Sequence, residues 1–167
     1  MAGRRDVDAD CSDIAAFAAL RGRLGAVDHL ITSPAKRCVQ TAETLLPQAS
    51  SIADPRLWEQ DFGAWEGLAH ADLPDLGPLT TAQIAAHRPP MGESFDDLCA
   101  RALPALHGHQ GRVVIVTHAG VIRCALGSAL GRQDAGLAFQ IAPLSLTKII
   151  VLADGQCAIS CVNWTAE

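Results

Sequence analysis

The chain has 167 residues, of which 49% are hydrophobic and 19% charged, and this balance excludes a disordered protein. The formal net charge of −5 argues against nucleic acid or an anionic membrane as a partner, and no apolar run reaches the ~18–20 residues that a membrane-spanning helix needs. The basic start has no apolar stretch behind it and the six cysteines lack metal-ligand spacing, so we expect a cytoplasmic protein with reduced thiols and no metal.

The first third of the chain alternates between helix and strand signals. A helix is predicted over residues 12–24, because apolar residues share one face, Ser12 can cap the start and Gly25 can end it. Residues 28–32 predict a short strand. Ser33 followed by a proline then predicts the start of a helix that runs to about residue 46. A second short strand is predicted at residues 49–53.

Residues 54–93 are rich in proline and glycine and hold only short helical stretches, such as residues 80–87. This composition indicates a long excursion from the core rather than a linker between two domains. We therefore expect a single domain over residues 1–167, with a loop-rich cap inserted at about 54–93.

The last part of the chain holds the clearest strand. Ser94 and Asp97 form a capping-box pattern that begins a helix with an apolar face, which Pro104 should kink or shorten. Residues 112–117 are almost continuously apolar and β-branched, as expected for a parallel strand covered on both faces. A helix at about 121–130 and a hairpin of strands 145–152 and 156–163 follow. This order predicts an α/β sandwich with a mostly parallel sheet.

Two strand-to-helix corners carry polar side chains that suit an anion. Ligands of such sheets bind beyond the carboxyl ends of the strands, where helix N-termini offer unpaired N–H groups. Arg37 lies one turn into the helix after residues 28–32, and a guanidinium can donate two hydrogen bonds to one phosphoryl group. His118 follows the apolar strand directly. Taken alone, Arg37 is more often a solvated helix arginine and His118 a structural histidine.

Residues 57–67 (LWEQDFGAWEG) gather acidic side chains and three aromatic rings in a loop-rich stretch. An apolar cluster packed under a long loop is one explanation. The other is a carboxylate, Glu59 or Glu66, whose pKa is raised beside apolar rings so that it donates a proton near neutral pH.

Four segments together resemble the histidine phosphatase superfamily, in particular its phosphoglycerate-mutase-like and α-ribazole-phosphatase-like members. They occur in the family's order and cover most of the chain from residue 28 onward: residues 32–42 (TSPAKRCVQTA), 57–67, 92–94 (GES) and 113–123 (VVIVTHAGVIR). The resemblance implies a three-layer α/β sandwich and a metal-independent phosphomonoesterase that acts on a small phosphorylated metabolite through a phosphohistidine, without a cofactor.

The resemblance also implies roles for particular residues. Arg37 would be the second arginine of the phosphate pocket, and His118 would hold the phosphoryl oxygens and stabilise the transition state. Glu59 would protonate the leaving oxygen and later activate water, whereas Glu66 would be structural. Residues 3–10 resemble the loop that follows the nucleophile in some members, so Arg4 is expected to contact substrate, as is Ser33.

One part of the family pattern is missing. The family carries its nucleophilic histidine and first phosphate arginine in an Arg-His-Gly motif at the end of the first strand, and no such motif precedes Ser33. We expect that the first strand is absent from this chain and that the missing piece ends shortly before Met1. Because that strand is central in the family's sheet, its absence would expose two strand edges. Negligible phosphohydrolase activity is expected from residues 1–167 alone.

Two other functions remain open at this point. One is a mutase that moves a phosphoryl group on a three-carbon acid, which would need a long-lived phosphohistidine and a bisphosphate primer. The other is a non-catalytic protein that binds phosphate through Arg37 and His118. The substrate is expected to be small and phosphorylated in each case. The C-terminal hairpin is equally consistent with pairing to a second subunit and with an ordinary sheet edge.

Overall fold

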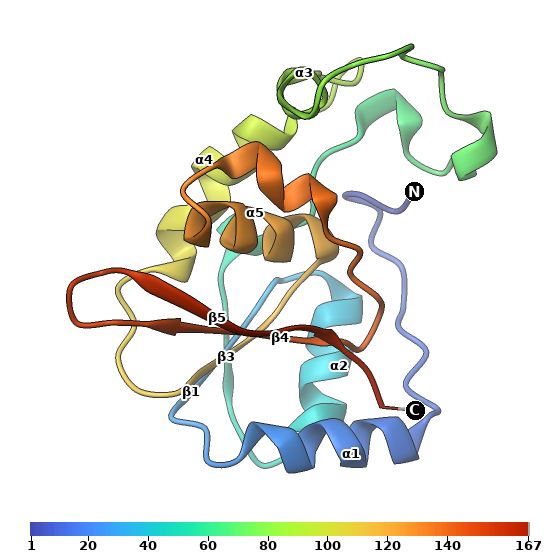
Figure 1. Cartoon of the computed structure of the whole chain (residues 1–167). Helices are drawn as coiled ribbons and strands as arrows, with labels where there is room; N and C mark the ends of the chain where they lie inside the picture. The colour runs from blue at the N-terminus through green and yellow to red at the C-terminus, as the bar shows by residue number, and fades with distance from the viewer. Residues whose placement is uncertain (167) are drawn as a thin grey trace.

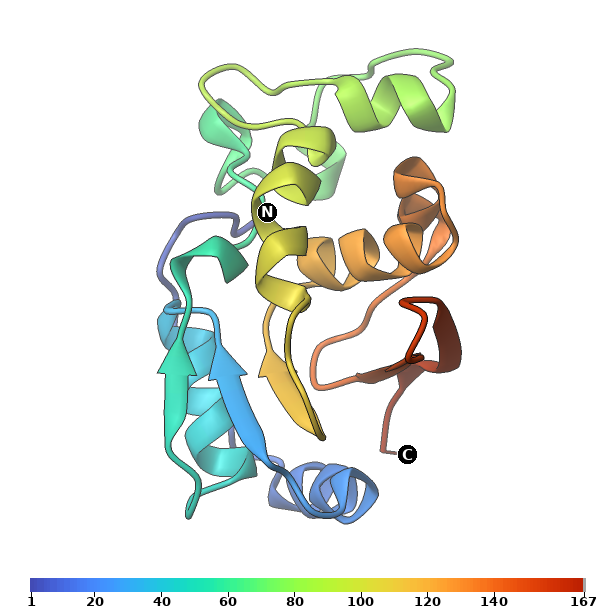
Figure 2. The same cartoon turned by 90° about the vertical axis from the view of Figure 1, so that its left-hand side faces the viewer.

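Three parallel strands form the central sheet of this computed structural model, in which residues 1–166 are described. The strands are β1 (His29–Thr32), β2 (Ser51–Ala53) and β3 (Val113–Val116), in the spatial order β2-β1-β3. In this register, Leu30 of β1 is opposite Ser51 on one side and Val114 on the other. Figure 2 shows the three strands pointing the same way, so their carboxyl ends meet at one edge.

Helices cover both faces of this sheet, as the α/β sandwich prediction requires. On one face, α2 (Lys36–Leu45) contacts β1 and β3, and α1 (Ile14–Leu24) packs against α2. On the other face, α4 (Phe95–Leu106) and α5 (Ala119–Ala129) pack against each other and against Ile31. The main core cluster therefore joins β1, α4 and α5, with Leu57, Leu98 and Val121 almost fully buried in it.

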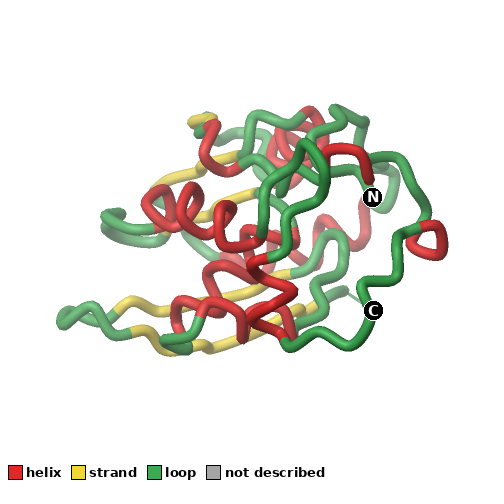
Figure 3. The backbone as a smooth tube through the Cα atoms, turned by 90° about the horizontal axis from the view of Figure 1, so that it is seen from above, coloured by secondary structure: helices red, strands yellow, loops and turns green. Residues whose placement is uncertain are grey.

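The C-terminal strands form a sheet of their own. β4 (Leu146–Val151) and β5 (Cys157–Trp164) pair antiparallel, as predicted, after the 3-10 helix η4 (Gln133–Ala138). Leu146 and Trp164 pack on the second core cluster, which consists of Phe17, Leu20 and Leu45. In Figures 1 and 3 this hairpin extends beside the parallel sheet as a separate ribbon.

A cavity lies between the two sheets. Among residues 1–166, β3 pairs only with β1 and β4 only with β5, so one edge of each strand has no neighbour. The space has a volume of about 920 Å³, and side chains of β3, β4, α4 and α5 line it, among them Val113, Ile115, Leu106, Val121, Ile149 and Val151. This cavity explains why all four residues of β3 are half-buried, although the sequence predicts a strand covered on both faces.

Residues 54–93 leave the core above the carboxyl edge of the sheet. They contain three 3-10 turns, η1 (Pro55–Leu57), η2 (Gly63–Trp65) and η3 (His70–Asp72), and one short helix, α3 (Thr81–Ala86). The predicted capping box at Ser94 is present at the start of α4. None of the helices within residues 1–166 is both long and apolar enough to span a bilayer.

Two local predictions need correction. Asp13, not Ser12, caps α1, because its carboxylate accepts from the N–H of Ala16. Ser33 does not cap α2, since that helix begins three residues later and the Ser33 hydroxyl is bonded to His118. Pro104 lies inside α4, and the helix stops two residues later at Leu106; the expected kink or shortening stays a prediction.

Candidate active site

The carboxyl edge of the sheet brings the two predicted corners together. Arg37 comes from the first turn of α2, after β1, and His118 precedes α5, after β3. The guanidinium of Arg37 lies 3.2 Å from Nδ1 of His118, and Nε2 of His118 lies 2.9 Å from the hydroxyl of Ser33. These three side chains, separated by up to 85 positions in sequence, therefore form one polar cluster.

The partners of His118 fix its protonation state. Arginine can only donate, so Nδ1 of His118 accepts, and the neutral ring carries its proton on Nε2 and donates it to Ser33. Burial chiefly, together with the nearby cations of Arg37, Arg101 and Arg4, lowers the pKa of His118 to about 3. In the absence of an anion, His118 is therefore neutral across the physiological pH range.

The segment before α1 lies against this cluster. Arg37 donates to the carbonyl oxygens of Gly3 at 2.9 Å and Arg5 at 2.8 Å. The guanidinium of Arg4 lies 5.6 Å from the ring centre of Trp58, and that ring stacks on His118 with centroids 6.3 Å apart. Arg4 is thus beside the candidate pocket, and its buried Nε has no hydrogen-bond partner within residues 1–166.

Glu59 turns its carboxyl group inward beneath the start of α5. One carboxylate oxygen accepts from the N–H of Gln60 at 2.9 Å, and the other from the N–H of Gly120 at 3.3 Å. A Cβ on residue 120 would lie 2.2 Å from Glu59, so only glycine allows this approach. Burial raises the pKa of Glu59, against the lowering effect of these two hydrogen bonds and of the Arg37 and Arg123 charges.

Glu66 makes a different set of contacts. Its carboxylate accepts from the backbone N–H of Arg4 at 2.6 Å and of Phe62 at 3.3 Å, and so ties the start of the chain to the loop. A structural role for Glu66 stays a prediction, which these two contacts support. The catalytic roles of Glu59, Arg37 and His118 stay predictions, as do the substrate contacts of Arg4 and Ser33.

Sequence reasoning missed several contributors to the site. The sequence indicates Trp58 only as part of an aromatic cluster, and it gives no signal for Cys38, whose sulfur lies 3.6 Å from Nε2 of His118. Burial raises the pKa of Cys38 to about 11, so it stays protonated. Arg101 carried no signal, because an arginine within an amphipathic helix looks like any solvated one. Glu93 belongs to the GES motif, but its role could not be read from the motif.

No cluster of three or more metal-ligating side chains occurs within the described part of the chain.

Comparison with known proteins decides the family. The family model described as the histidine phosphatase superfamily (branch 1) matches residues 1–165. The chain belongs to the histidine phosphatase superfamily. A bifunctional protein of Mycobacterium tuberculosis is 33% identical over 168 residues, which cover 91% of this chain but 45% of that protein. The chain thus spans less than half the length of this curated relative of the superfamily.

Solved structures of histidine phosphatases share the fold. A mycobacterial glucosyl-3-phosphoglycerate phosphatase matches with a TM-score of 0.82 and 23% identity, over 99% of this chain and 92% of that one. The α-ribazole phosphatase of Shigella flexneri matches with a TM-score of 0.79 and 21% identity, over 98% and 88%. The phosphoglycerate-mutase-like, helix-flanked α/β architecture is therefore confirmed.

Proposed function

We propose that this histidine phosphatase is a metal-independent phosphomonoesterase that acts on a small phosphorylated metabolite, with Arg37 and His118 binding the phosphoryl group and Glu59 as the proton donor. One observation carries the proposal: Arg37 and His118 meet at the carboxyl edge of the sheet with a hydrogen bond of 3.2 Å, although 81 residues separate them. Donors that converge at the start of a helix are the arrangement that stabilises a transferring phosphoryl group.

Glu59 supports the chemistry of the leaving group. A carboxyl group with a raised pKa keeps its proton nearer to neutral pH and can give it to the alkoxide that departs from phosphorus. In the proposed reaction, a nitrogen of the nucleophilic histidine, which is expected in an Arg-His-Gly motif before Met1 and is not His118, bonds to phosphorus. The ester oxygen leaves at the same time with the proton of Glu59. Water then attacks the phosphohistidine, the Glu59 carboxylate takes a proton from that water, and phosphate leaves while the histidine recovers its lone pair.

The cavity between β3 and β4 supports a strand as the source of the nucleophile. Both strand edges that border the cavity lack a partner within residues 1–166, and its lining is largely apolar, as a buried strand requires. Gly3 lies at the carboxyl edge, within hydrogen-bond distance of Arg37. A strand that fills the cavity and continues into Met1 would end at that edge, parallel to β3, and would present its last side chains to Arg37 and His118.

The cap segment bears on the substrate. Between residues 69 and 91 the basic residues are few (His70, His87 and Arg88), which favours a monophosphate over a highly anionic bisphosphate. Arg88 is also paired with Asp97 at 2.7 Å. Arg4 is the cation best placed for a second contact, because its guanidinium stacks on Trp58 beside His118.

Hydrolysis of p-nitrophenyl phosphate tests the proposal with two forms of the protein. Residues 1–167 alone should show negligible turnover, whereas a form extended before Met1 by an apolar strand ending in Arg-His-Gly should turn over the ester in the presence of a chelator. That activity should disappear in His118→Ala and fall strongly in Glu59→Gln. An acid-labile phosphoryl group on the added histidine should be trapped on rapid quenching.

Other outcomes point to other functions. Turnover by residues 1–167 that survives His118→Ala would contradict the proposal. A long-lived phosphohistidine discharged only by a phosphorylated acid would indicate a mutase. Phosphate binding by both forms without any turnover would indicate a non-catalytic phosphate-binding protein.

A further inference from the structure

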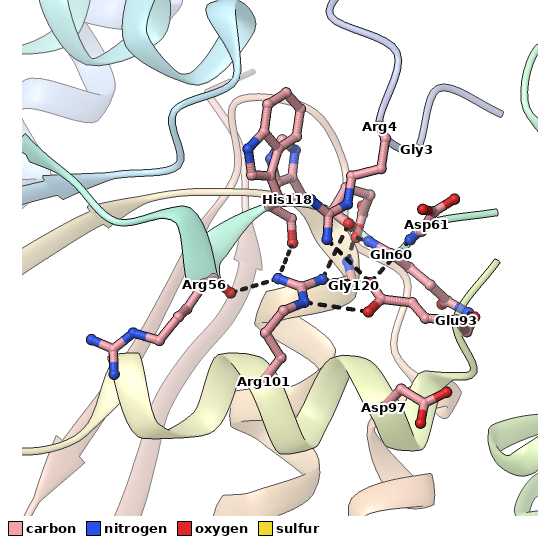
Figure 4. Close-up of polar contacts among 12 residues, drawn as sticks. Gly3, Arg4, Arg56, Gln60, Asp61, Glu93, Asp97, Arg101, His118 and Gly120 are labelled. Carbon is pink, nitrogen blue, oxygen red and sulfur yellow. Dashed lines mark hydrogen bonds and ion pairs between the residues drawn. The ribbon is translucent and has the colours of Figure 1, made fainter. Parts of the chain in front are cut away.

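Arg101 holds the loop that carries Glu59. This residue lies in the middle of α4, and its side chain is 22% exposed. Its guanidinium donates to three main-chain carbonyl oxygens: Arg56 at 2.7 Å, Trp58 at 3.1 Å and Glu59 itself at 3.3 Å (Figure 4). The same group forms an ion pair with the carboxylate of Glu93. One side chain thus fixes the backbone up to and including the candidate proton donor.

Glu93 fixes the loop on the other side of Glu59. Its carboxylate accepts from the N–H of Asp61 at 3.0 Å, and its own N–H donates to the Asp61 carbonyl at 2.8 Å. The side chain of Gln60 donates to the carbonyl oxygen of Glu93 at 2.9 Å. Residues 56–59 are therefore tied to α4 by Arg101, and residues 60–61 are tied to Glu93, which Arg101 also holds.

We infer that Arg101 is a positioning residue: by clamping the backbone of residues 56–59 to α4, it holds the Glu59 carboxylate against the N–H of Gly120 at the start of α5. This inference rests on the proposed function in one respect, which is that Glu59 is taken to be the proton donor. The geometry itself does not depend on turnover. Arg101 makes no hydrogen bond to Arg37, His118 or Ser33 and holds Glu59 through the loop, although its charge also lowers the pKa of His118.

The shape of the guanidinium matters as much as its charge. Its planar fork reaches three carbonyl oxygens and a carboxylate together, and an ammonium group on a single flexible stem cannot match this set. Without the clamp, the carbonyl oxygens of Arg56, Trp58 and Glu59 would each need a water molecule as a partner. Water that enters at this place would reach the Glu59 carboxyl group and remove the desolvation that now raises its pKa.

Arg101 can affect Glu59 by holding its backbone in place or by its positive charge, and the two effects change the pKa of Glu59 in opposite directions. An NMR titration of the Glu59 carboxyl carbon therefore separates them. Loss of a positive charge alone would raise the pKa of Glu59, since nearby cations favour the carboxylate. Loss of position, with entry of water, would lower the pKa toward that of an exposed glutamate. The charges of Arg37 and Arg123, which also face Glu59 from α2 and α5, are unchanged in every variant.

The titration compares Arg101→Lys and Arg101→Met with the unmodified chain of residues 1–167. We expect the pKa of Glu59 to fall in both, by about one pH unit or more, although only the second loses the charge. The matched control is Arg56→Gln, which removes an exposed guanidinium of the same loop and should leave the pKa of Glu59 unchanged; within residues 1–166 this guanidinium pairs only with Asp54. A pKa that rises in Arg101→Met and stays constant in Arg101→Lys would overturn the inference.

Arg101→Met leaves the Glu93 carboxylate without its nearest cation, so this variant is the more prone to unfold. Arg101→Lys keeps a charge beside Glu93, and the result on this variant alone decides the question. In the extended, active form, Arg101→Lys should lower kcat with little change in KM and shift the limb of the pH profile that Glu59 sets. An inactive extended form with the pKa of Glu59 still dependent on Arg101 would refute the proposed function and leave the positioning role intact.

Discussion

Replacement of His118 by glutamine tests the electrostatics of the pocket through protein stability. The pKa of His118 falls from an ordinary 6.5 to about 3 in the folded state, chiefly because the ring is buried. Between these two pH values the unfolded chain binds a proton at His118 that the folded chain does not bind. The contribution of His118 to the free energy of unfolding is therefore fully present well above pH 6.5 and is lost as the pH falls. The loss is about 3 kcal/mol at pH 4.5 and about 4 kcal/mol at pH 3, and it approaches about 5 kcal/mol only at lower pH.

Glutamine offers a donor and an acceptor for Ser33 and Arg37 but does not titrate. We therefore expect His118→Gln to keep about 3 kcal/mol more of its pH 7 stability at pH 4.5 than the unmodified chain does. Urea unfolding at both pH values measures the free energy of unfolding, and only the difference between the two is compared. The matched control is His29→Gln, which removes an exposed histidine at the start of β1. Equal losses in the unmodified chain and in His118→Gln would refute the assignment of a neutral, buried His118.

Three further substitutions and one matched control test other parts of the structure. Because burial raises the pKa of Glu59, its contribution to stability should be lost as the pH rises from the ordinary pKa of a glutamate through the raised one, and Glu59→Gln should remove this loss in urea unfolding curves. Leu98→Ala, in the fully buried core of α4, should lower the free energy of unfolding by about 2–5 kcal/mol. Gly63→Ala should destabilise strongly in thermal unfolding, because φ is +50° and a Cβ would lie 2.2 Å from the carbonyl oxygen of Pro90. Gly77→Ala, with a similar φ of +69° but open space, should cost far less.

Much of the fold followed from local patterns in the sequence. The periodicity of residues 12–24, the β-branched run at 112–117 and the capping box at Ser94 each gave an element of the right type. The caps were harder, because neighbouring residues compete for one role. Asp13 took the position expected for Ser12, and the Ser33 hydroxyl was used by His118 rather than by α2.

The site was predictable only where backbone geometry places a side chain. Arg37 and His118 follow parallel strands directly, so the strand order alone brings them to one edge. Arg101 reaches Glu59 across a loop of irregular structure, and no periodic pattern reports which helix arginine will do so. The half-buried state of β3 depends on what occupies the space beside it, which is a tertiary property.

The charges around the candidate pocket suit the phosphorylated substrate that we propose, although the chain as a whole is acidic. His118 is neutral, and the raised pKa of Glu59 favours its uncharged form, so neither supplies a counter-charge to the cations nearby. Arg101 is neutralised by Glu93, but no ion pair within residues 1–166 includes Arg37. Arg37 satisfies its donors with the carbonyl oxygens of Gly3 and Arg5. A phosphoryl group bound there would bring a negative charge to Arg37, raise the pKa of His118 and so reduce the loss of stability at low pH.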